Sequence, residues 1–410
     1  MIRAILFFGC LCCAYSQTRL ESVAVEGSSL PQKTVVELSG FQIGANIDRA
    51  LIEAGCKKLE ETGLFSSIQF RYAPTPKNGF ALTLSLVDQG GLSAAVVDVP
   101  GADESEVWRW LAAKFPAFSK KVPGNDAAQH VIALQMEEHL GAKLHGQKLV
   151  TRIEADFGTG RSVLSFQPEH LPRIDAMTFP GASQVTQEQA KQVMQKVTLD
   201  RGYTDRRFRG LLENNLRPAY EERGLYRVRF PEIRIEFLDP AAVAVTTTVE
   251  EGPKYSLGDV TLAGDDLPAH LLEDAKFRKG DVANWTEIQK RIWEMESPVK
   301  RSGYFEAVAK PERIFHDDTQ VLDLRISFAK GPLYHFGQLK IIGLNPEQEE
   351  KARKAWKKNP GDAYDFAYSG EFLRAFSQLV DLHQFKKYDS RAEKGTGDHT
   401  MDVLFLFEPK

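Results

Sequence analysis

Two stretches of this chain repeat each other, and this repetition constrains the fold more than any other feature. The first runs from Glu251 to Gly264 and the second from Lys330 to Gly343. Their glycines are six residues apart and are displaced by a constant offset, since 331−252, 337−258 and 343−264 all equal 79. In each copy a Gly-Pro break precedes a short apolar strand, and a glycine closes the strand where the chain must turn sharply. The chain therefore contains a repeated module.

Weaker copies of the strand-then-glycine signal occur upstream and end at Gly27, Gly101 and Gly181. With the two later closing glycines, 264 and 343, the differences between successive positions are 74, 80, 83 and 79. Five repeats of similar length therefore fill the chain after residue 16. The predicted domains are residues 18–89, 90–172 (the most divergent), 173–252, 253–331 and 332–410.

Each repeat has the same predicted interior. A short helical segment follows the closing glycine, and a longer one carries an apolar stripe, such as Trp285, Ile288, Ile292 and Met295 in the fourth repeat. The longer helix ends at a glycine with an aromatic residue close behind, as at Gly224-Leu225-Tyr226 and Gly303-Tyr304-Phe305.

Two strands then finish each repeat as a hairpin. In the fourth repeat we expect Val308 to Ile314 to pair with Val321 to Phe328 across a polar turn. The predicted fold class is α+β: a tandem array of five β-α-α-β-β domains, each a three-stranded mixed sheet covered by two helices.

The segment from Met1 to Ser16 is typical of an export signal. Arg3 precedes an apolar run from Ala4 to Tyr15, and Ala14-Tyr15-Ser16 is a small-residue cleavage site. A lipoprotein signal that anchors the chain through Cys10 or Cys13 is the alternative. Cys56 is the one cysteine outside the signal, so we predict a core thiol and no intramolecular disulfide.

Motifs for catalysis and metal binding were not found in the sequence. The nine histidines form no His-x-x-x-His pair, and His130 and His139 are nine residues apart. Adjacent acids such as Glu60 and Glu61 do not share a helix face, and neither a Gly-x-Ser-x-Gly elbow nor a phosphate-binding Gly-rich loop occurs. The sequence therefore predicts no catalytic residue, no metal, no cofactor and no enzyme activity.

Nucleic acid is not an expected partner. The net charge is −4, and export would remove the chain from nucleic acid. The arginine-rich segment Arg201 to Arg209 is therefore interpreted as a solvated helix face rather than a single-strand-binding surface.

The glycine motif, the Gly-Asp pairs Gly280-Asp281 and Gly361-Asp362, and the Gly-Tyr-Phe corner together resemble a known family. They are similar to the polypeptide-transport-associated (POTRA) repeats in the periplasmic arm of outer-membrane barrel assembly proteins. The resemblance implies a location in the periplasm or on the periplasmic face of the outer membrane. Members of the family usually continue into a membrane barrel. This chain ends with the fifth repeat, so we expect only the soluble arm to carry over from the resemblance.

The resemblance also implies how such a chain would act. A three-stranded sheet has two edges with unpaired backbone groups, to which an extended client can add a strand. In the family the second strand commonly offers that edge, which points to strands over Ile68 to Tyr72, Val228 to Ile233 and Val308 to Ile314. The candidate partner-binding residues are Ile68, Phe70, Tyr72, Val228, Phe230, Ile233, Val308 and Ile314.

A short basic segment with one tryptophan is a candidate contact with anionic lipid. Its residues are Lys351, Arg353, Lys354, Trp356, Lys357 and Lys358. If the fifth repeat lies nearest the membrane, as the resemblance implies, this segment would meet the lipid headgroups. The alternative interpretation is a solvated helix face.

The predicted function is that of a non-enzymatic periplasmic scaffold that binds client or partner strands in outer-membrane protein assembly or transport. Its partners would be unfolded outer-membrane proteins or a separately encoded barrel component. Two alternatives remain open: a structural spacer or envelope interaction module without client binding, and an envelope enzyme with a site at a seam between repeats.

Overall fold

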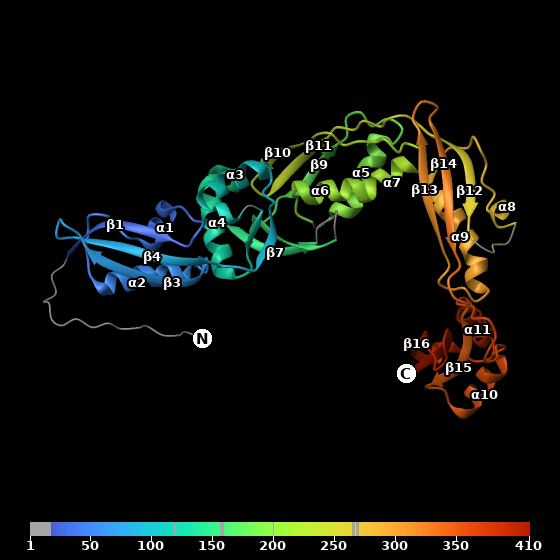
Figure 1. Cartoon of the computed structure of the whole chain (residues 1–410). Helices are drawn as coiled ribbons and strands as arrows, with labels where there is room; N and C mark the ends of the chain where they lie inside the picture. Colours follow the sequence, from blue (N-terminus) through green and yellow to red (C-terminus); the bar gives the residue numbers. More distant parts are fainter. Residues whose placement is uncertain (1–17, 119, 156–159, 200, 265–266, 268–269) are drawn as a thin grey trace. The chain divides into compact units, whose positions relative to one another are not determined.

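The computed structural model describes residues 18–118, 120–155, 160–199, 201–264, 267 and 270–410. The predicted signal segment, residues 1–16, lies outside these residues. The described residues form five sheets with their helices (Figure 1). Contacts divide the chain into two compact units, one made of residues up to 180, 187–215 and 230–248, and the other of residues 181–186, 216–229 and 249–410. The α+β class with mixed sheets is confirmed.

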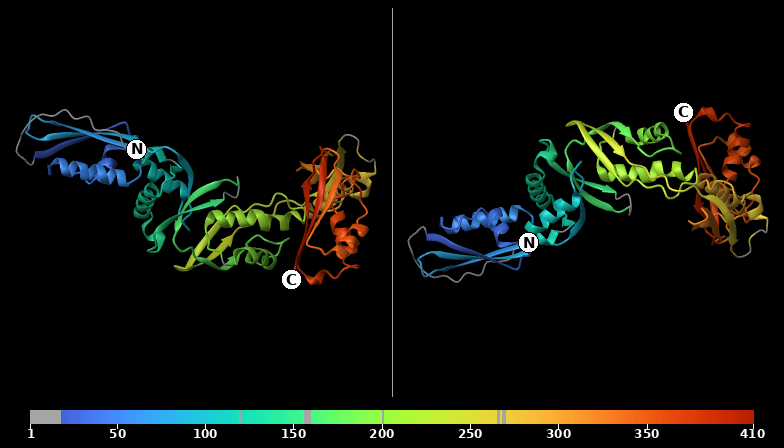
Figure 2. Two further views of the ribbon diagram at one scale, coloured as in Figure 1. Left: turned by 90° about the horizontal axis from the view of Figure 1, so that it is seen from below. Right: turned by 90° about the horizontal axis from the view of Figure 1, so that it is seen from above.

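The first sheet has four strands in the order β2-β1-β4-β3, with β1 and β4 parallel and the other pairs antiparallel. Figure 2 shows this sheet in blue with its helices along one face. Three strands were predicted; the fourth arises because the link between the two helices pairs with β1. The elements are β1 (Thr18–Glu26), α1 (Gln32–Ser39), β2 (Asn46–Ile47), α2 (Arg49–Glu61), β3 (Phe65–Pro74) and β4 (Phe80–Asp88).

The second sheet repeats this arrangement in the order β6-β5-β8-β7. Here too the link between the helices supplies an additional edge strand, β6, so the prediction of three strands is wrong for the first two sheets. The elements are β5 (Leu92–Val97), α3 (Glu104–Lys114), η1 (Pro116–Phe118), β6 (Lys121–Pro123), α4 (Asp126–Leu140), η2 (Gly141–Leu144), β7 (Leu149–Ala155) and β8 (Ser162–Pro168).

The third sheet has three strands in the order β10-β11-β9. Its second helical segment changes from α-helix to a π-helical turn and back, and Pro218, which has no N–H to donate, opens the last piece. The elements are β9 (Arg173–Thr178), α5 (Gln187–Thr198), α6 (Asp205–Leu211), η3 (Leu212–Leu216), α7 (Arg217–Glu221), β10 (Ile233–Asp239) and β11 (Ala242–Thr247).

The fourth and fifth sheets also have three strands each, with the last strand of the repeat in the middle. The predicted hairpin of the fourth repeat is confirmed, since Val308 pairs with Ala329 and His316 with Val321. The fourth set is β12 (Ser256–Ala263), α8 (Leu271–Asp274), α9 (Trp285–Arg301), β13 (Val308–His316) and β14 (Val321–Ala329). The fifth is β15 (His335–Ile342), α10 (Pro346–Ala355), α11 (Tyr368–Phe376), η4 (Leu382–Gln384), β16 (Phe385–Lys394) and β17 (Thr400–Pro409).

Four of the five closing glycines pass against the end of the last strand of their own repeat; Gly101 instead faces side chains of β10. A Cβ at Gly343 would lie 1.8 Å from the carbonyl oxygen of Phe407, and one at Gly264 would lie 2.5 Å from that of Phe328. Gly27 and Gly181 meet the chain at the end of the last strand in the same way. The sharp turn predicted at these glycines is therefore a close approach of two backbones that any side chain would block.

The predicted apolar stripes are mostly correct. Ile288, Ile292 and Met295 are buried on α9. In the first and fifth repeats the apolar pattern is less exact, since Leu51 on α2 and Phe366 before α11 are 53% and 41% exposed.

Candidate partner-binding surfaces

The second long strand of each described repeat lies at an edge of its sheet. These strands are β3, β7, β10, β13 and β16. This edge position follows from the strand order. The last strand of a repeat pairs in parallel with the first strand on one side and with the second strand on the other, so the second strand is bonded on one side only. Such an edge presents a row of N–H and C=O groups to which another chain can bond.

On β3, the three predicted residues share one face of the strand. Ile68 and Phe70 pack against the core, whereas Tyr72 is 47% exposed. The Tyr72 ring meets Phe80 edge-on, with 5.4 Å between ring centroids. The strand thus places an ordered aromatic ring beside an open backbone edge.

The third repeat differs from the prediction. The strand expected over Val228 to Ile233 is instead β10, which begins at Ile233. Val228 and Phe230 precede it and are 1% and 8% exposed, because the chain there is still held by the bridge between Arg229 and Glu250. A strand prediction cannot distinguish such a buried connection from a strand, because both are apolar and alternating. Leu238 on β10 is an exposed apolar residue that the sequence-based candidates for partner binding did not include.

On β13, Val308 and Ile314 lie where they were predicted, and Val308 is 38% exposed. Pro311 lies between them and pairs with Ile326 without a shift in register. Since the ladder to β14 is uninterrupted, the ring nitrogen of Pro311 faces the outer edge, where it provides no donor. The outer edge of β13 therefore lacks one backbone N–H donor at Pro311.

A second recurring feature joins one repeat to the next. The N–H of Tyr255 donates to the carbonyl of Gly224 at 2.9 Å, and the N–H of Tyr334 donates to Gly303 at 2.8 Å. The two bonds are related by the same offset as the motif copies, because 334−255 and 303−224 both equal 331−252. The tyrosine of the Gly-Pro-x-Tyr motif therefore bonds the start of a repeat to the helix-to-sheet corner of the preceding one.

Side chains reinforce the joint at Tyr255. Its hydroxyl donates to Asp317, and Arg227 Nη2 lies 2.9 Å from Asp317 Oδ1. Hydrogen bonds from Tyr255 and Arg227 lower the pKa of Asp317. The guanidinium of Arg227 also covers the ring of Phe315 at 4.4 Å. Tyr255, Arg227 and Asp317 are thus bonded to one another, which gives this ionisable cluster a structural role.

The basic segment of the fifth repeat has ion-pair partners within its own helix. Lys351, Arg353 and Lys354 pair with Glu347, Glu349 and Glu350, each four residues earlier, at 2.7 Å. Trp356 packs among aromatic rings of the core, including Phe372 at 5.4 Å. Lys357 is exposed and Lys358 lies over Tyr368. The lipid contact of these six residues remains a prediction.

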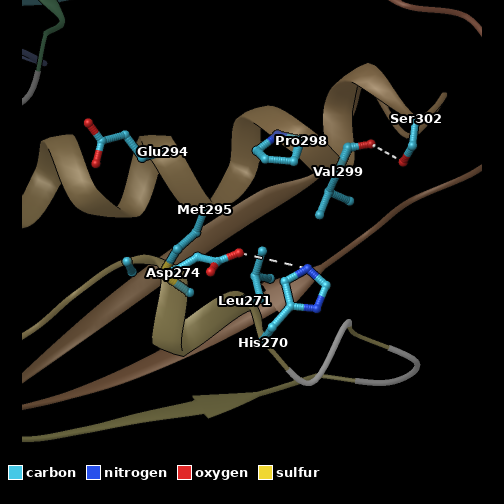
Figure 3. A pocket seen from close by; sticks show the side chains of 9 residues that line it. His270, Leu271, Asp274, Glu294, Met295, Pro298, Val299 and Ser302 are labelled. Carbon is cyan, nitrogen blue, oxygen red and sulfur yellow. Dashed lines mark hydrogen bonds and ion pairs between the residues drawn. The ribbon is translucent and has the colours of Figure 1, made fainter.

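A pocket of about 260 Å³ lies between α8 and α9 (Figure 3). Its floor is apolar, with Leu271, Met295 and Val299. At its rim His270 Nε2 lies 3.8 Å from Asp274 Oδ2, and both side chains are exposed. This pair lies in solvent rather than converging on an enclosed space, so the pocket lacks the arrangement that acid-base catalysis needs.

Metal-binding clusters and membrane-spanning helices are absent from the residues that the structure describes. No group of three or more His, Cys, Asp or Glu side chains there could hold a metal ion. No helix within the same residues is long and apolar enough to span a bilayer.

Two single residues have strongly altered environments. Cys56 is partly buried against the core, as predicted, and burial together with Glu53 raises its pKa to about 11. Asp98 is 4% exposed and accepts a 2.7 Å hydrogen bond from Thr204 Oγ1. Burial raises the pKa of Asp98 from 3.8 to about 6. Asp98 was not predicted as a site, because a lone acid just after an apolar strand carries no motif.

No protein-family model matches the chain. Among curated proteins, the chain is similar to one from Treponema pallidum (strain Nichols) named "Putative outer membrane protein assembly factor". The two are 21% identical over 213 residues, which is 51% of this chain and 23% of the relative. The match thus spans about a quarter of that relative's length.

Solved structures similar to the chain include POTRA domains 3–5 of Haemophilus influenzae BamA, with 17% identity, a TM-score of 0.43, and coverage of 58% of this chain and 97% of that one. Another is POTRA domains 1–3 of Omp85 from Anabaena, with 15% identity, a TM-score of 0.26, and coverage of 58% and 95%. The chain is therefore similar to POTRA-repeat proteins and to an outer-membrane assembly factor, as its repeated glycine motif predicts.

Proposed function

We propose that the chain is a non-enzymatic scaffold of five POTRA-like repeats that acts in outer-membrane protein assembly or transport, on the periplasmic side. It binds strands of unfolded outer-membrane proteins, or of a separately encoded barrel component, by adding them to the edges of its sheets. The curated relative's name and the POTRA domains of the similar structures support the general role.

The observation that carries the proposal is the position of the second strand at a sheet edge in each described repeat. Strand addition requires only backbone hydrogen bonds and shallow contacts with alternate side chains, which suits clients of many sequences. Barrel strands alternate apolar and polar residues and can present an apolar face to Tyr72 on β3.

The test is crosslinking in cells with the full chain. A photoreactive amino acid at Tyr72, at the edge strand β3, should capture unfolded outer-membrane proteins or a barrel component. The matched control is the same amino acid at Lys33 on α1 of the same repeat, which is exposed but has no open backbone edge.

Equal capture from both positions would contradict edge binding. If neither position captures a protein while the chain is exported and folded, the spacer interpretation replaces the scaffold.

A further inference from the structure

A wide groove runs along β9, the first strand of the third repeat. This strand is the edge of the sheet opposite to β10. It has a volume of about 950 Å³ and lies between β9, α5 and the chain that follows α5. Its lining residues are Leu171, Arg173, Ile174, Asp175, Ala176, Met177, Lys191, Gln195, Lys196, Thr198, Leu199, Arg201 and Gly202.

In the other repeats, the link between the two helices covers the beginning of the first strand. In the first two repeats this link forms β2 on β1 and β6 on β5. In the fourth and fifth repeats it forms a single bridge, between Ser256 and Val282 and between His335 and Ala363. The first strand of each of these sheets therefore has part of its outer edge bonded within the chain.

In the third repeat, the described residues of this link, which leave out residue 200, form no strand or bridge on β9. Among them, the N–H of Tyr203 donates to the carbonyl of Pro172 at 2.7 Å, but Pro172 precedes β9. The N–H of Arg173 points inward, since it donates to Ala241 at 2.8 Å. Among the described residues, β9 bonds to β11 alone, so its outer edge is free along its length.

The groove beside this edge is strongly basic. Its lining includes four cations, Arg173, Lys191, Lys196 and Arg201, and one carboxylate, Asp175. Asp175 is paired with Arg173 at 2.7 Å. The side chains of Lys191, Lys196 and Arg201 have no ion-pair partner among the described residues, in a protein whose net charge is −4. Three cations thus remain for an incoming ligand.

The groove also offers apolar contact. Leu199 is 75% exposed at its rim, and Ala176 is exposed on β9. An extended chain alternates its side chains between two faces, so a ligand strand could place apolar side chains on one face and carboxylates on the other.

We propose that the outer edge of β9 binds an extended acidic segment of a partner protein as a fourth strand, with its carboxylates beside Lys191, Lys196 and Arg201. This inference rests on the proposed scaffold function and specifies the chemistry of one partner. The free backbone edge favours a peptide over an anionic lipid, because a headgroup would use the cations and leave the strand unpaired.

The experiment measures binding of fluorescent eight-residue peptides to the full chain by anisotropy. A peptide of alternating Glu and Val should bind, and one of alternating Lys and Val should not. N-methylation of alternate backbone nitrogens should abolish binding, since it removes the donors that a strand needs without changing charge.

The protein variant is the double substitution Lys196→Glu and Arg201→Glu, which should weaken binding of the acidic peptide by about tenfold or more. Its matched control, Lys33→Glu with Lys57→Glu, changes the net charge equally at exposed positions of the first repeat and should bind as the unaltered chain does.

Equal binding of the N-methylated peptide would overturn strand addition. Binding to phosphatidylglycerol vesicles that depends on Lys196 and Arg201, with no binding of the acidic peptide, would overturn the proposal in favour of a lipid surface. Client capture from Tyr72 does not involve this groove. Failure of the peptide-binding experiment would therefore leave the proposed function intact, and failure of crosslinking from Tyr72 would not by itself exclude peptide binding at β9.

Discussion

Asp98 is a carboxylate whose burial makes the stability of its surroundings depend on pH. Its folded pKa is about 6, above the ordinary 3.8, so the folded chain retains this proton to a higher pH than the unfolded chain does. The contribution of Asp98 to the free energy of unfolding therefore falls as pH rises from about 4 through about 6, and is constant above. Nearby Glu154 reinforces the shift, and Arg207 opposes it.

We expect Asp98→Asn to remove this dependence. Between pH 5 and pH 7.5 the unaltered chain should lose about 1 kcal/mol more opening free energy than the variant does. The measurement is hydrogen exchange of β8 amides, corrected for the intrinsic rate at each pH. Asp126→Asn, at an exposed acid on α4, should keep the original profile. A variant with an unchanged pH profile would show that Asp98 is not the titrating group.

Gly258 and Gly337, the middle glycines of the repeated motif, are required for a different reason from the closing glycines. A Cβ at Gly337 would lie 2.2 Å from Asp402 Oδ1, which accepts a 2.8 Å hydrogen bond from the N–H of Gln338. At Gly258 the same contact involves Asp323, and the two carboxylates are related by the offset of the motif, since 402−323 equals 337−258. Each glycine makes room for a carboxylate from the last strand.

Gly337→Ala should therefore destabilise the fifth repeat by about 2 kcal/mol, because the new methyl group must displace a nearly buried carboxylate. Limited proteolysis should show faster cleavage within residues 332–410, since cleavage follows the open population. Gly370→Ala is the control: it lies in α11, where a Cβ meets nothing within 4 Å, and should slow cleavage or leave it unchanged. Equal effects of the two changes would refute the role of Asp402.

At the scale of elements, the edge strands are not equivalent, and Pro311 provides a direct comparison. Replacing it with Val would restore an N–H at the outer edge of β13 while keeping a β-branched residue that suits a strand. We expect Pro311→Val to increase client crosslinking from a photoreactive group at Val308. Capture from Tyr72 on β3 should not change. Unaltered capture from Val308 would mean that β13 does not bind clients through its backbone.

The sequence predicts elements best where a local rule decides the structure. The closing glycines, the helix ends at Gly224 and Gly303 and the hairpin after α9 all follow from backbone requirements visible within a few residues. The additional strands β2 and β6 could not be predicted, because two or three residues carry no period. The start of β10 was misplaced because Val228 is apolar through burial in a connection.

The candidate sites were less predictable than the fold for the same reason. The edge position of β3 follows from the repeat topology, whereas the free edge beside the groove arises because the described residues of the link in the third repeat form no bridge to β9. Lys196 and Arg201 appear in sequence as ordinary solvated charges. Only the three-dimensional arrangement shows that they flank an unpaired strand.

At the scale of the whole molecule, consecutive repeats are joined by the same backbone bond where the Gly-Pro-x-Tyr motif is present, and by a different bond in the second repeat, which lacks it. In the fourth and fifth repeats Tyr255 and Tyr334 bond to the corner glycine of the preceding repeat. The divergent second repeat lacks the tyrosine, and the side chain of Asn125, which caps α4, donates to the carbonyl of Gly63 at 3.0 Å instead. A corner carbonyl is thus the common acceptor in all three joints.

If the tyrosine joint holds consecutive repeats together, Tyr255→Ala should loosen the joint while leaving each sheet folded. The ring of Tyr255 is 1% exposed and its hydroxyl bonds to Asp317, so its loss removes both packing and the anchor of Arg227. Hydrogen exchange of the amides at positions 255 and 283 should accelerate by about tenfold or more, whereas Leu324 in the centre of the sheet should remain protected. Tyr388→Ala, at a half-exposed tyrosine on β16, should change neither. Loss of protection at Leu324 as well would mean that Tyr255 supports the fold of the repeat itself, and that the joint is not a separate structural element.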